Sequence, residues 1–231
     1  MEFTLKSTTE GQLILVDKPL QITSFQVVNK IRWGLKSKYN LNKLKVGHAG
    51  TLDPLASGLL IICTGKMTKK INELQDLEKT YTGTITLGAT TASYDLETPI
   101  DEKFPISHLN EEGLIAATKK FKGEIDQYPP IYSAIKKKGK RLYEYARSGE
   151  KIQIDSRKVT IHYFDLKKIK LPDLNFEVKC SKGTYIRSLA NDFGKSVNSG
   201  GYFTSFRRTA VGPFKLENAL TPQELLKKLE L

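Results

Sequence analysis

The chain has 231 residues, enough for one large or two small domains, and 39% of them are apolar, so a buried core is feasible. The formal net charge of +12 suggests a polyanionic partner such as nucleic acid, although the same charge could serve only as a solubilising surface. We expect a cytoplasmic protein without a membrane segment or a metal site, because no apolar run reaches about 18 residues, no signal peptide is evident, and the cysteines and histidines lack ligand spacing.

The first elements are predicted to be a strand, a helix and a basic loop. Residues 13–16 read as a buried strand that ends in the turn Asp17-Lys18-Pro19. Ser24 is predicted to cap a helix, and residues 36–45 to form a polar, basic loop. The apolar face of this helix would contain Val27, Val28, Ile31 and Leu35.

A loop at residues 47–58 places one carboxylate among three glycines and a proline. Asp53 precedes Pro54, which favours an extended backbone, and Gly50 and Gly58 permit tight turns. The apolar run 59–63 behind the loop predicts a buried strand. This arrangement suits a carboxylate that is aimed at a target. An alternative is that Asp53 only caps a helix that begins at Pro54. A phosphate-binding loop is excluded, because Met67 follows Gly65-Lys66.

The middle of the chain alternates between strand and helix patterns. One helical face would contain Met67, Ile71 and Leu74. Residues 79–88 alternate as a half-buried strand, with Tyr81 on the apolar face, where it could be only a core aromatic. Residues 95–105 are predicted to be a loop and residues 109–121 a helix.

A run of basic residues follows residues 128–135 and predicts a hairpin. A helix is expected at residues 142–147, with Gly149 as its stop. Aromatic residues flank the run on both sides, as RNA binding would use, although a solvated lysine-rich turn is the alternative. The basic residues are Lys136, Lys137, Lys138, Lys140 and Arg141.

The last part of the chain predicts strands at residues 159–171, 175–180 and 202–214. Between the last two, residues 181–190 change from strand to helix, and Arg187 lies beside the apolar helix face. An arginine there usually needs a carboxylate partner. Thr221, Pro222 and Glu224 form a capping box for a final helix. The elements do not alternate as βαβ units, so we expect an α+β fold: one domain over residues 1–231 on a largely antiparallel mixed sheet.

Several motifs together resemble those of the TruB family of tRNA pseudouridine-55 synthases. The loop matches G-H-x-G-T-L-D-P-x-A-x-G-x-L, and G-x-x-T-K follows its strand. Further matches are P-P-x-Y-S-A-x-K at residues 129–136, G-T-Y-I-R-[ST]-L at 183–189 and R-R-T at 207–209. Ala49 stands where many members have Thr, and Phe206 replaces the usual Leu.

The resemblance implies a pseudouridine synthase fold with an active-site cleft and a basic hairpin insertion. Asp53 would be the catalytic carboxylate and Arg187 its partner, and Tyr81 would stack on the target base. His48 would fill the space that the flipped uridine leaves. Lys18, Lys69 and Tyr185 would also lie near the substrate. The RNA-binding residues would be Lys136, Lys137, Lys138, Lys140, Arg141, Arg207 and Arg208.

The resemblance also implies the T-arm of tRNA as partner and no cofactor, and we expect a monomer. Longer members carry a C-terminal PUA domain, and because this chain stops at Leu231 we expect none here. Two other functions remain open: a tRNA-binding folding factor that remodels the T-arm, and a basic ribosome-associated protein without an active site. Asp53, Tyr81 and Arg187 argue against a folding factor without catalysis, and the several loop motifs argue against the ribosome-associated protein.

Overall fold

The computed structural model describes residues 3–230, which fall into two compact units. The first comprises Met1–Tyr81 and Phe206–Leu231, and the second comprises Thr82–Ser205. Two strands, β4 (Lys79–Leu87) and β12 (Gly201–Val211), contribute residues to both units. The single domain expected from the sequence therefore stays a prediction.

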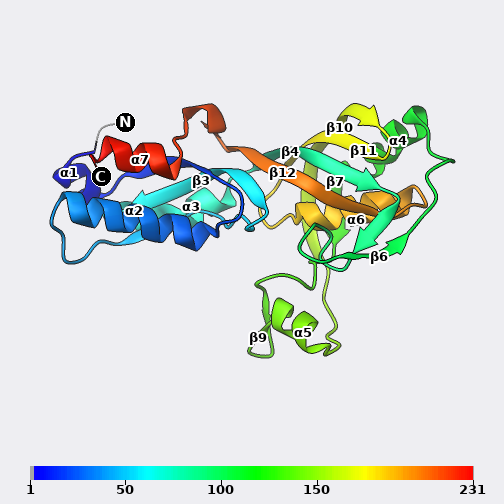
Figure 1. The fold of residues 1–231 in the computed structure, drawn as a ribbon, viewed down its shortest axis with the longest axis horizontal. Helices are drawn as coiled ribbons and strands as arrows, with labels where there is room; N and C mark the ends of the chain where they lie inside the picture. The colour runs from blue at the N-terminus through cyan, green and yellow to red at the C-terminus, as the bar shows by residue number, and fades with distance from the viewer. Residues whose placement is uncertain (1–2, 231) are drawn as a thin grey trace. The chain divides into compact units, whose positions relative to one another are not determined.

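The sheet of the first unit is built around β3 (Ala56–Thr64) (Figure 1). It pairs antiparallel with β1 (Leu13–Lys18) and β2 (Val46–His48), and parallel with β12. The short strand β13 (Phe214–Lys215) pairs with β12. All of β3 except Ser57 is buried, which explains why its sequence is continuously apolar and does not alternate.

Helices cover both faces of this sheet. On one face, α2 (Ser24–Lys38) and α7 (Pro222–Lys228) lie side by side and pack against Leu60 and Ile62 of β3 (Figure 1). On the other face, η1 (Gly65–Lys70) and α3 (Ile71–Asp76) pack against Leu59, Ile61 and Cys63. Two short helices, α1 (Leu5–Glu10) and η3 (Leu216–Asn218), complete the unit.

The second unit has a mostly antiparallel sheet in the order β12-β4-β11-β10-β7. Its long strands are β10 (Arg157–Lys170) and β11 (Asp173–Cys180), and β7 (Gly123–Gln127) pairs with β10. The helices of this unit include α4 (Glu111–Thr118), η2 (Lys119–Phe121) and α6 (Ile186–Ser196). Of these, η2 and α6 each contribute one ring to a core of aromatic side chains in edge-to-face or tilted contacts. These rings belong to Phe121, Phe164, Phe176, Phe193 and Phe203.

Two small hairpin sheets extend the second unit. One pairs β5 (Ala89–Thr91) with β6 (Ile100–Lys103), so part of the predicted 95–105 loop is in fact a strand. The other pairs β8 (Lys136–Lys137) with β9 (Lys140–Arg141) and is followed by α5 (Leu142–Ser148). Figure 1 shows β9 and α5 projecting from the sheet of their own unit.

Two of the three predicted helix caps agree with the structure. Thr221 caps α7 through the predicted capping box, and Gly149 ends α5 in the left-handed conformation at φ +70°. The apolar face predicted for α6 is buried. The helix α2 differs, because Thr23 rather than Ser24 is its N-cap, and its hydroxyl accepts from the amide of Gln26 at 3.1 Å. No helix within residues 3–230 is both long and apolar enough to cross a bilayer.

Candidate active site

The loop that carries Asp53 connects β2 to β3, two strands that pair with each other. The amide of Ala49 donates to the carbonyl of Ile61 at 2.9 Å, which extends this pairing into the loop. The amide of Ala56 donates to the carbonyl of Asp53 at 3.0 Å, so residues 53–56 form a turn with Pro54 at its second position. No helix begins at Pro54, and the alternative role of Asp53 as a helix cap is therefore wrong.

The N-terminus of α2 holds the loop on both sides of Asp53. The amide of Leu52 donates to the Ser24 hydroxyl at 2.8 Å, and this hydroxyl donates to the Leu52 carbonyl at 3.0 Å. The amide of Gln21 donates to the carbonyl of Pro54 at 2.8 Å. Both residues next to Asp53 are thus fixed by long-range hydrogen bonds, which pre-organise the carboxylate.

Arg208 holds the same loop from the other side. Its Nε donates to the carbonyl of Leu59 at 2.7 Å, and its two terminal nitrogens donate to the carbonyls of Gly50 and Thr51 at 3.0 and 3.4 Å. The side chain is 1% exposed. The prediction that Arg208 binds RNA does not agree with this burial, because no face of the guanidinium is left for a phosphate.

Gly58 allows this close approach. Arg208 is paired with Gly58 in the parallel register of β12 and β3. Gly58 has φ +105°, and a Cβ atom there would lie 2.3 Å from the carbonyl oxygen of Arg208. Only glycine fits this position.

Lys18 lies beneath the loop and is fully buried. Its ammonium donates to the carbonyls of Pro19 and Ile22, both at 2.8 Å. Burial lowers its pKa to about 8, while the charge of Asp53 opposes this shift and that of Arg208 adds to it. Lys18 is therefore an internal cation near Asp53. Direct contact with the substrate, as the sequence suggested, does not agree with its enclosure.

His48 and Arg207 flank this centre. Burial, and next the charge of Arg208, lower the pKa of His48, so its imidazole is neutral at physiological pH. A neutral, flat ring is suited to stacking between bases. Arg207 is half-exposed and pairs with Asp17 at 2.5 Å. It remains a candidate for RNA contact.

Tyr81 and Lys69 complete the predicted residues of the first unit. Tyr81 is 8% exposed on the buried face of β4, as its alternating pattern predicted. Lys69 lies exposed near the end of η1. Tyr81 is thus nearly buried, its stacking on the target base stays a prediction, and Lys69 is available to solvent.

Arg187 is buried in the second unit at the start of α6 and is 4% exposed. It donates to the carbonyls of Ser93 and Tyr132 at 3.1 and 2.9 Å. Its Nε lies 3.6 Å from a carboxylate oxygen of Asp95, which is also buried. The expectation of a carboxylate beside Arg187 is confirmed, although sequence reasoning did not identify Asp95 as that carboxylate. The predicted pair with Asp53 would join the two units and stays a prediction.

Tyr185 precedes α6 and is held through its backbone. Its amide donates to Oε1 of Gln127 at 2.7 Å, and Nε2 of Gln127 donates to its carbonyl at 3.0 Å. The guanidinium of Arg157 lies 4.8 Å from the centre of the tyrosine ring, a cation–π contact. Sequence reasoning did not find Gln127 or Arg157, because both contacts join segments far apart in the chain.

The basic hairpin is confirmed, with a tight turn in which Lys138 and Gly139 have φ +50° and +84°. Its cations are not equivalent. Lys137 pairs with Asp155 at 2.7 Å and Lys140 with Glu150 at 2.6 Å. Lys136 and Lys138 are exposed and have no ion pair within residues 3–230. Arg141 lies over the ring of Tyr143.

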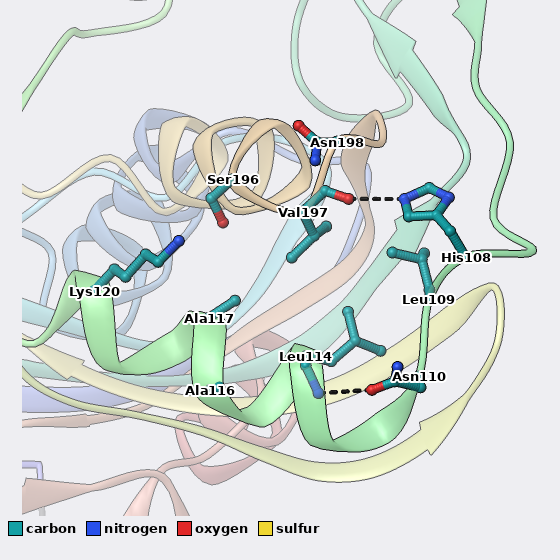
Figure 2. A pocket seen from close by; sticks show the side chains of 11 residues that line it. His108, Leu109, Asn110, Leu114, Ala116, Ala117, Lys120, Ser196, Val197 and Asn198 are labelled. Carbon is teal, nitrogen blue, oxygen red and sulfur yellow. Dashed lines mark hydrogen bonds between the residues drawn. The ribbon is translucent and has the colours of Figure 1, made fainter.

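A cavity of about 270 Å³ in the second unit is not part of this set (Figure 2). It lies between α4 and the end of α6, where Nε2 of His108 and the carbonyl of Val197 are 3.0 Å apart. None of the predicted site residues lines it. Within the described part of the chain, no three His, Cys, Asp or Glu side chains are grouped to hold a metal ion.

Comparisons with known proteins show the family and the fold of this chain. Residues 36–186 match the family model described as TruB family pseudouridylate synthase (N terminal domain). The chain is 61% identical over 212 residues to tRNA pseudouridine synthase B of Flavobacterium johnsoniae, covering 91% of this chain and 93% of that protein.

Two solved structures share the fold. A chain of a Cbf5-Nop10-Gar1 complex has a TM-score of 0.71 and 30% identity, and the match covers 96% of this chain and 55% of that one. A chain of an H/ACA RNP bound to a substrate RNA containing 2'-deoxyuridine has a TM-score of 0.68 and 29% identity, covering 96% of this chain and 54% of that one. This chain thus spans about half the length of these solved chains. The protein has the α+β pseudouridine synthase fold with a largely antiparallel sheet, and it belongs to the TruB family of pseudouridylate synthases.

Proposed function

We propose that the protein isomerises uridine 55 in the T-loop of tRNA to pseudouridine, with Asp53 as the catalytic carboxylate. The observation that carries this proposal is the fixation of the Asp53 loop by Ser24, Gln21 and Arg208. A carboxylate held on both sides by the backbone can act on a sugar with little loss of conformational entropy.

The reaction breaks the N1–C1′ bond of a uridine, turns the base and forms a C5–C1′ bond, while C5 loses a proton and N1 gains one. Asp53 can attack C1′ as a nucleophile, or remove a sugar proton in a glycal route. Either role places the carboxylate beside a buried cation, because the charges of Lys18 and Asp53 interact. No water is activated, so one carboxylate suffices.

The target base must leave its stack before Asp53 can reach C1′, and this costs a few kcal/mol. The neutral imidazole of His48 is proposed to occupy the space that the base leaves. Tyr81 and Tyr185 are proposed to contact the flipped base, and Arg187 to support the site together with Asp95. The basic hairpin and Arg207 are proposed to hold the tRNA backbone, and we expect this to take place in the cytoplasm.

Incubation of purified protein with unmodified, uridine-labelled tRNA tests the proposal directly. We expect pseudouridine at position 55 without added metal or cofactor. A tRNA in which uridine 55 is replaced by cytidine is the matched control. Absence of pseudouridine, or its formation at another position, would overturn the proposal.

A further inference from the structure

The helix α2 exposes two large aromatic side chains that the core does not use. Phe25 is 61% exposed and Trp33 is 59% exposed, although their neighbours Val27, Val28 and Ile31 are buried. The two aromatics are eight positions apart, which is about 12 Å along the helix. Asn29 lies between the two aromatics and Lys36 lies one turn beyond Trp33, so the four side chains follow one face of the helix. We call the residues Phe25, Asn29, Trp33 and Lys36 the α2 stripe.

The charged side chains of α2 itself are all positive. The helix carries Lys30, Arg32, Lys36 and Lys38 and has no aspartate or glutamate. Lys38 is paired with Glu230, and Arg32 donates to backbone and amide oxygens, but Lys30 is exposed to solvent. A polyanion is therefore attracted to this face.

The α2 stripe belongs to a helix that is hydrogen-bonded to the Asp53 loop and to the strand before it. Its first residue, Phe25, directly follows Ser24, whose hydroxyl is bonded to Leu52 beside the catalytic carboxylate. Farther along, Arg32 donates to Asn29 of the stripe and to the carbonyl of Val46, where β2 leads into the loop, both at 2.9 Å. An RNA that reaches Asp53 is thus brought next to α2.

We infer that the α2 stripe is a second contact surface for the substrate RNA, where Phe25 and Trp33 stack on unpaired bases and Lys30 faces phosphates. This inference rests on the proposed function. Isolated aromatics among basic and polar residues are the usual form of a stacking platform for bases. A protein partner fits less well, because stable protein interfaces bury about 800 Å² per partner with a closed apolar centre, whereas Asn29 separates these two rings.

The chain offers a direct probe, since Trp33 is its single tryptophan. Tryptophan emission and its quenching by acrylamide should be followed while unmodified tRNA is added at one fixed salt concentration. We expect the emission to fall, and the accessibility to acrylamide to decrease, in step with saturation by tRNA. Unchanged emission and accessibility at saturation would overturn the inference.

Affinity measurements provide the second arm. Trp33→Ala should raise the Kd for tRNA between about fivefold and 150-fold, the range that removal of one stacked aromatic produces, and Trp33→Phe should retain most of the affinity. The matched control is Ile115→Ala, which removes a 44% exposed apolar side chain from α4, a helix with acidic residues in its first turn. A Kd for Trp33→Ala within twofold of the control would contradict the inference.

Two further results separate this inference from its alternatives. If the protein forms pseudouridine in the same tRNA while the emission and accessibility of Trp33 stay unchanged, the α2 stripe is not an RNA contact surface. The proposed function would then remain intact. An emission change that depends on protein concentration without RNA would indicate self-association through α2, and would also reject the inference.

Discussion

The hydroxyl of Ser24 makes two hydrogen bonds with the backbone of Leu52, accepting from the amide at 2.8 Å and donating to the carbonyl at 3.0 Å. Both residues are almost fully buried. One side chain at the start of α2 thus satisfies both backbone groups of the residue before Asp53, which ties the position of the Asp53 carboxylate to the packing of a helix.

Ser24→Ala should therefore impair both stability and turnover. The substitution removes the Ser24 partner of the buried amide and of the buried carbonyl of Leu52. Each group left unsatisfied lowers the free energy of unfolding by about 1–3 kcal/mol. We expect kcat/KM to fall at least about tenfold, because the Asp53 loop is then held by fewer anchors. Ser37→Ala, at an exposed position of the same helix, is the control and should leave both quantities unchanged.

Asp53→Asn tests the catalytic role itself. The amide is nearly isosteric with the carboxylate, so the loop should keep its shape and the affinity for tRNA should change by less than about tenfold, or roughly 1.4 kcal/mol. Pseudouridine formation should fall below detection, because an amide can neither attack C1′ nor accept a sugar proton. Turnover by the purified variant would show that Asp53 is not the catalytic residue.

Gly58→Ala should be much more damaging than Gly149→Ala. Both glycines have positive φ, at +105° and +70°, so each substitution costs about 1–2 kcal/mol of backbone strain. Only at Gly58 does the new Cβ also meet a backbone atom, the carbonyl oxygen of Arg208 at 2.3 Å, while nothing lies within 4 Å at Gly149. Urea unfolding of the two variants measures this difference in stability. Equal decreases in the free energy of unfolding would contradict the close pairing of β3 with β12 at Gly58.

The buried ammonium of Lys18 should give stability a specific pH dependence. Its pKa is about 8 in the folded protein against an ordinary value of 10.5, so between these values the unfolded chain binds more protons. The free energy of unfolding contributed by this group therefore rises with pH from about 8 to 10.5, by no more than about 3 kcal/mol. Lys18→Met removes this component. We expect the wild-type free energy of unfolding to rise relative to that of Lys18→Met in urea titrations from pH 7.5 to pH 10 (about the range in which a lysine of lowered pKa titrates). Parallel curves for the two proteins would contradict the assignment.

The ion pairs of the basic hairpin predict which lysines bind RNA phosphates. Lys136 and Lys138 are exposed and have no ion pair within the described chain, whereas Lys137 and Lys140 are paired with Asp155 and Glu150. Replacing Lys136 and Lys138 together with Gln should flatten the plot of log K against log salt by about 0.7–0.9 for each phosphate that the variant no longer neutralises. The control replaces Lys119 and Lys122, two exposed lysines around η2. The same slope in both double variants would mean that the hairpin is only a solvated turn.

Periodic patterns predicted most of the fold because they report which face of an element is buried. The apolar run of β3, the alternation around Tyr81 and the apolar face of α6 all lie where the sequence placed them. Ser24 was misassigned because Thr23 and Ser24 can both cap a helix, and nothing local shows that the second hydroxyl bonds to a residue 28 positions away.

The site residues that sequence reasoning missed or misjudged act over long distances in the chain. Asp95 meets Arg187 from the segment between β5 and β6, and the two residues are 92 positions apart in the sequence. For Arg208 a signal was available, since it shares a strand face with Phe206, and that face is buried. The family motif drew attention to the arginine's charge and away from its position in the strand. The division into two units could not be foreseen, because β4 and β12 read as uninterrupted strands.

The clamp of Arg208 on the Asp53 loop joins residues 149 to 158 positions apart. During synthesis, the first 81 residues of the chain emerge well before β12 exists. The nascent chain therefore presents Asp53 and much positive charge to surrounding RNA while the loop lacks one of its anchors. Interactions of such long sequence separation form late in folding. The fully anchored Asp53 loop is therefore among the last features that a newly synthesised molecule acquires.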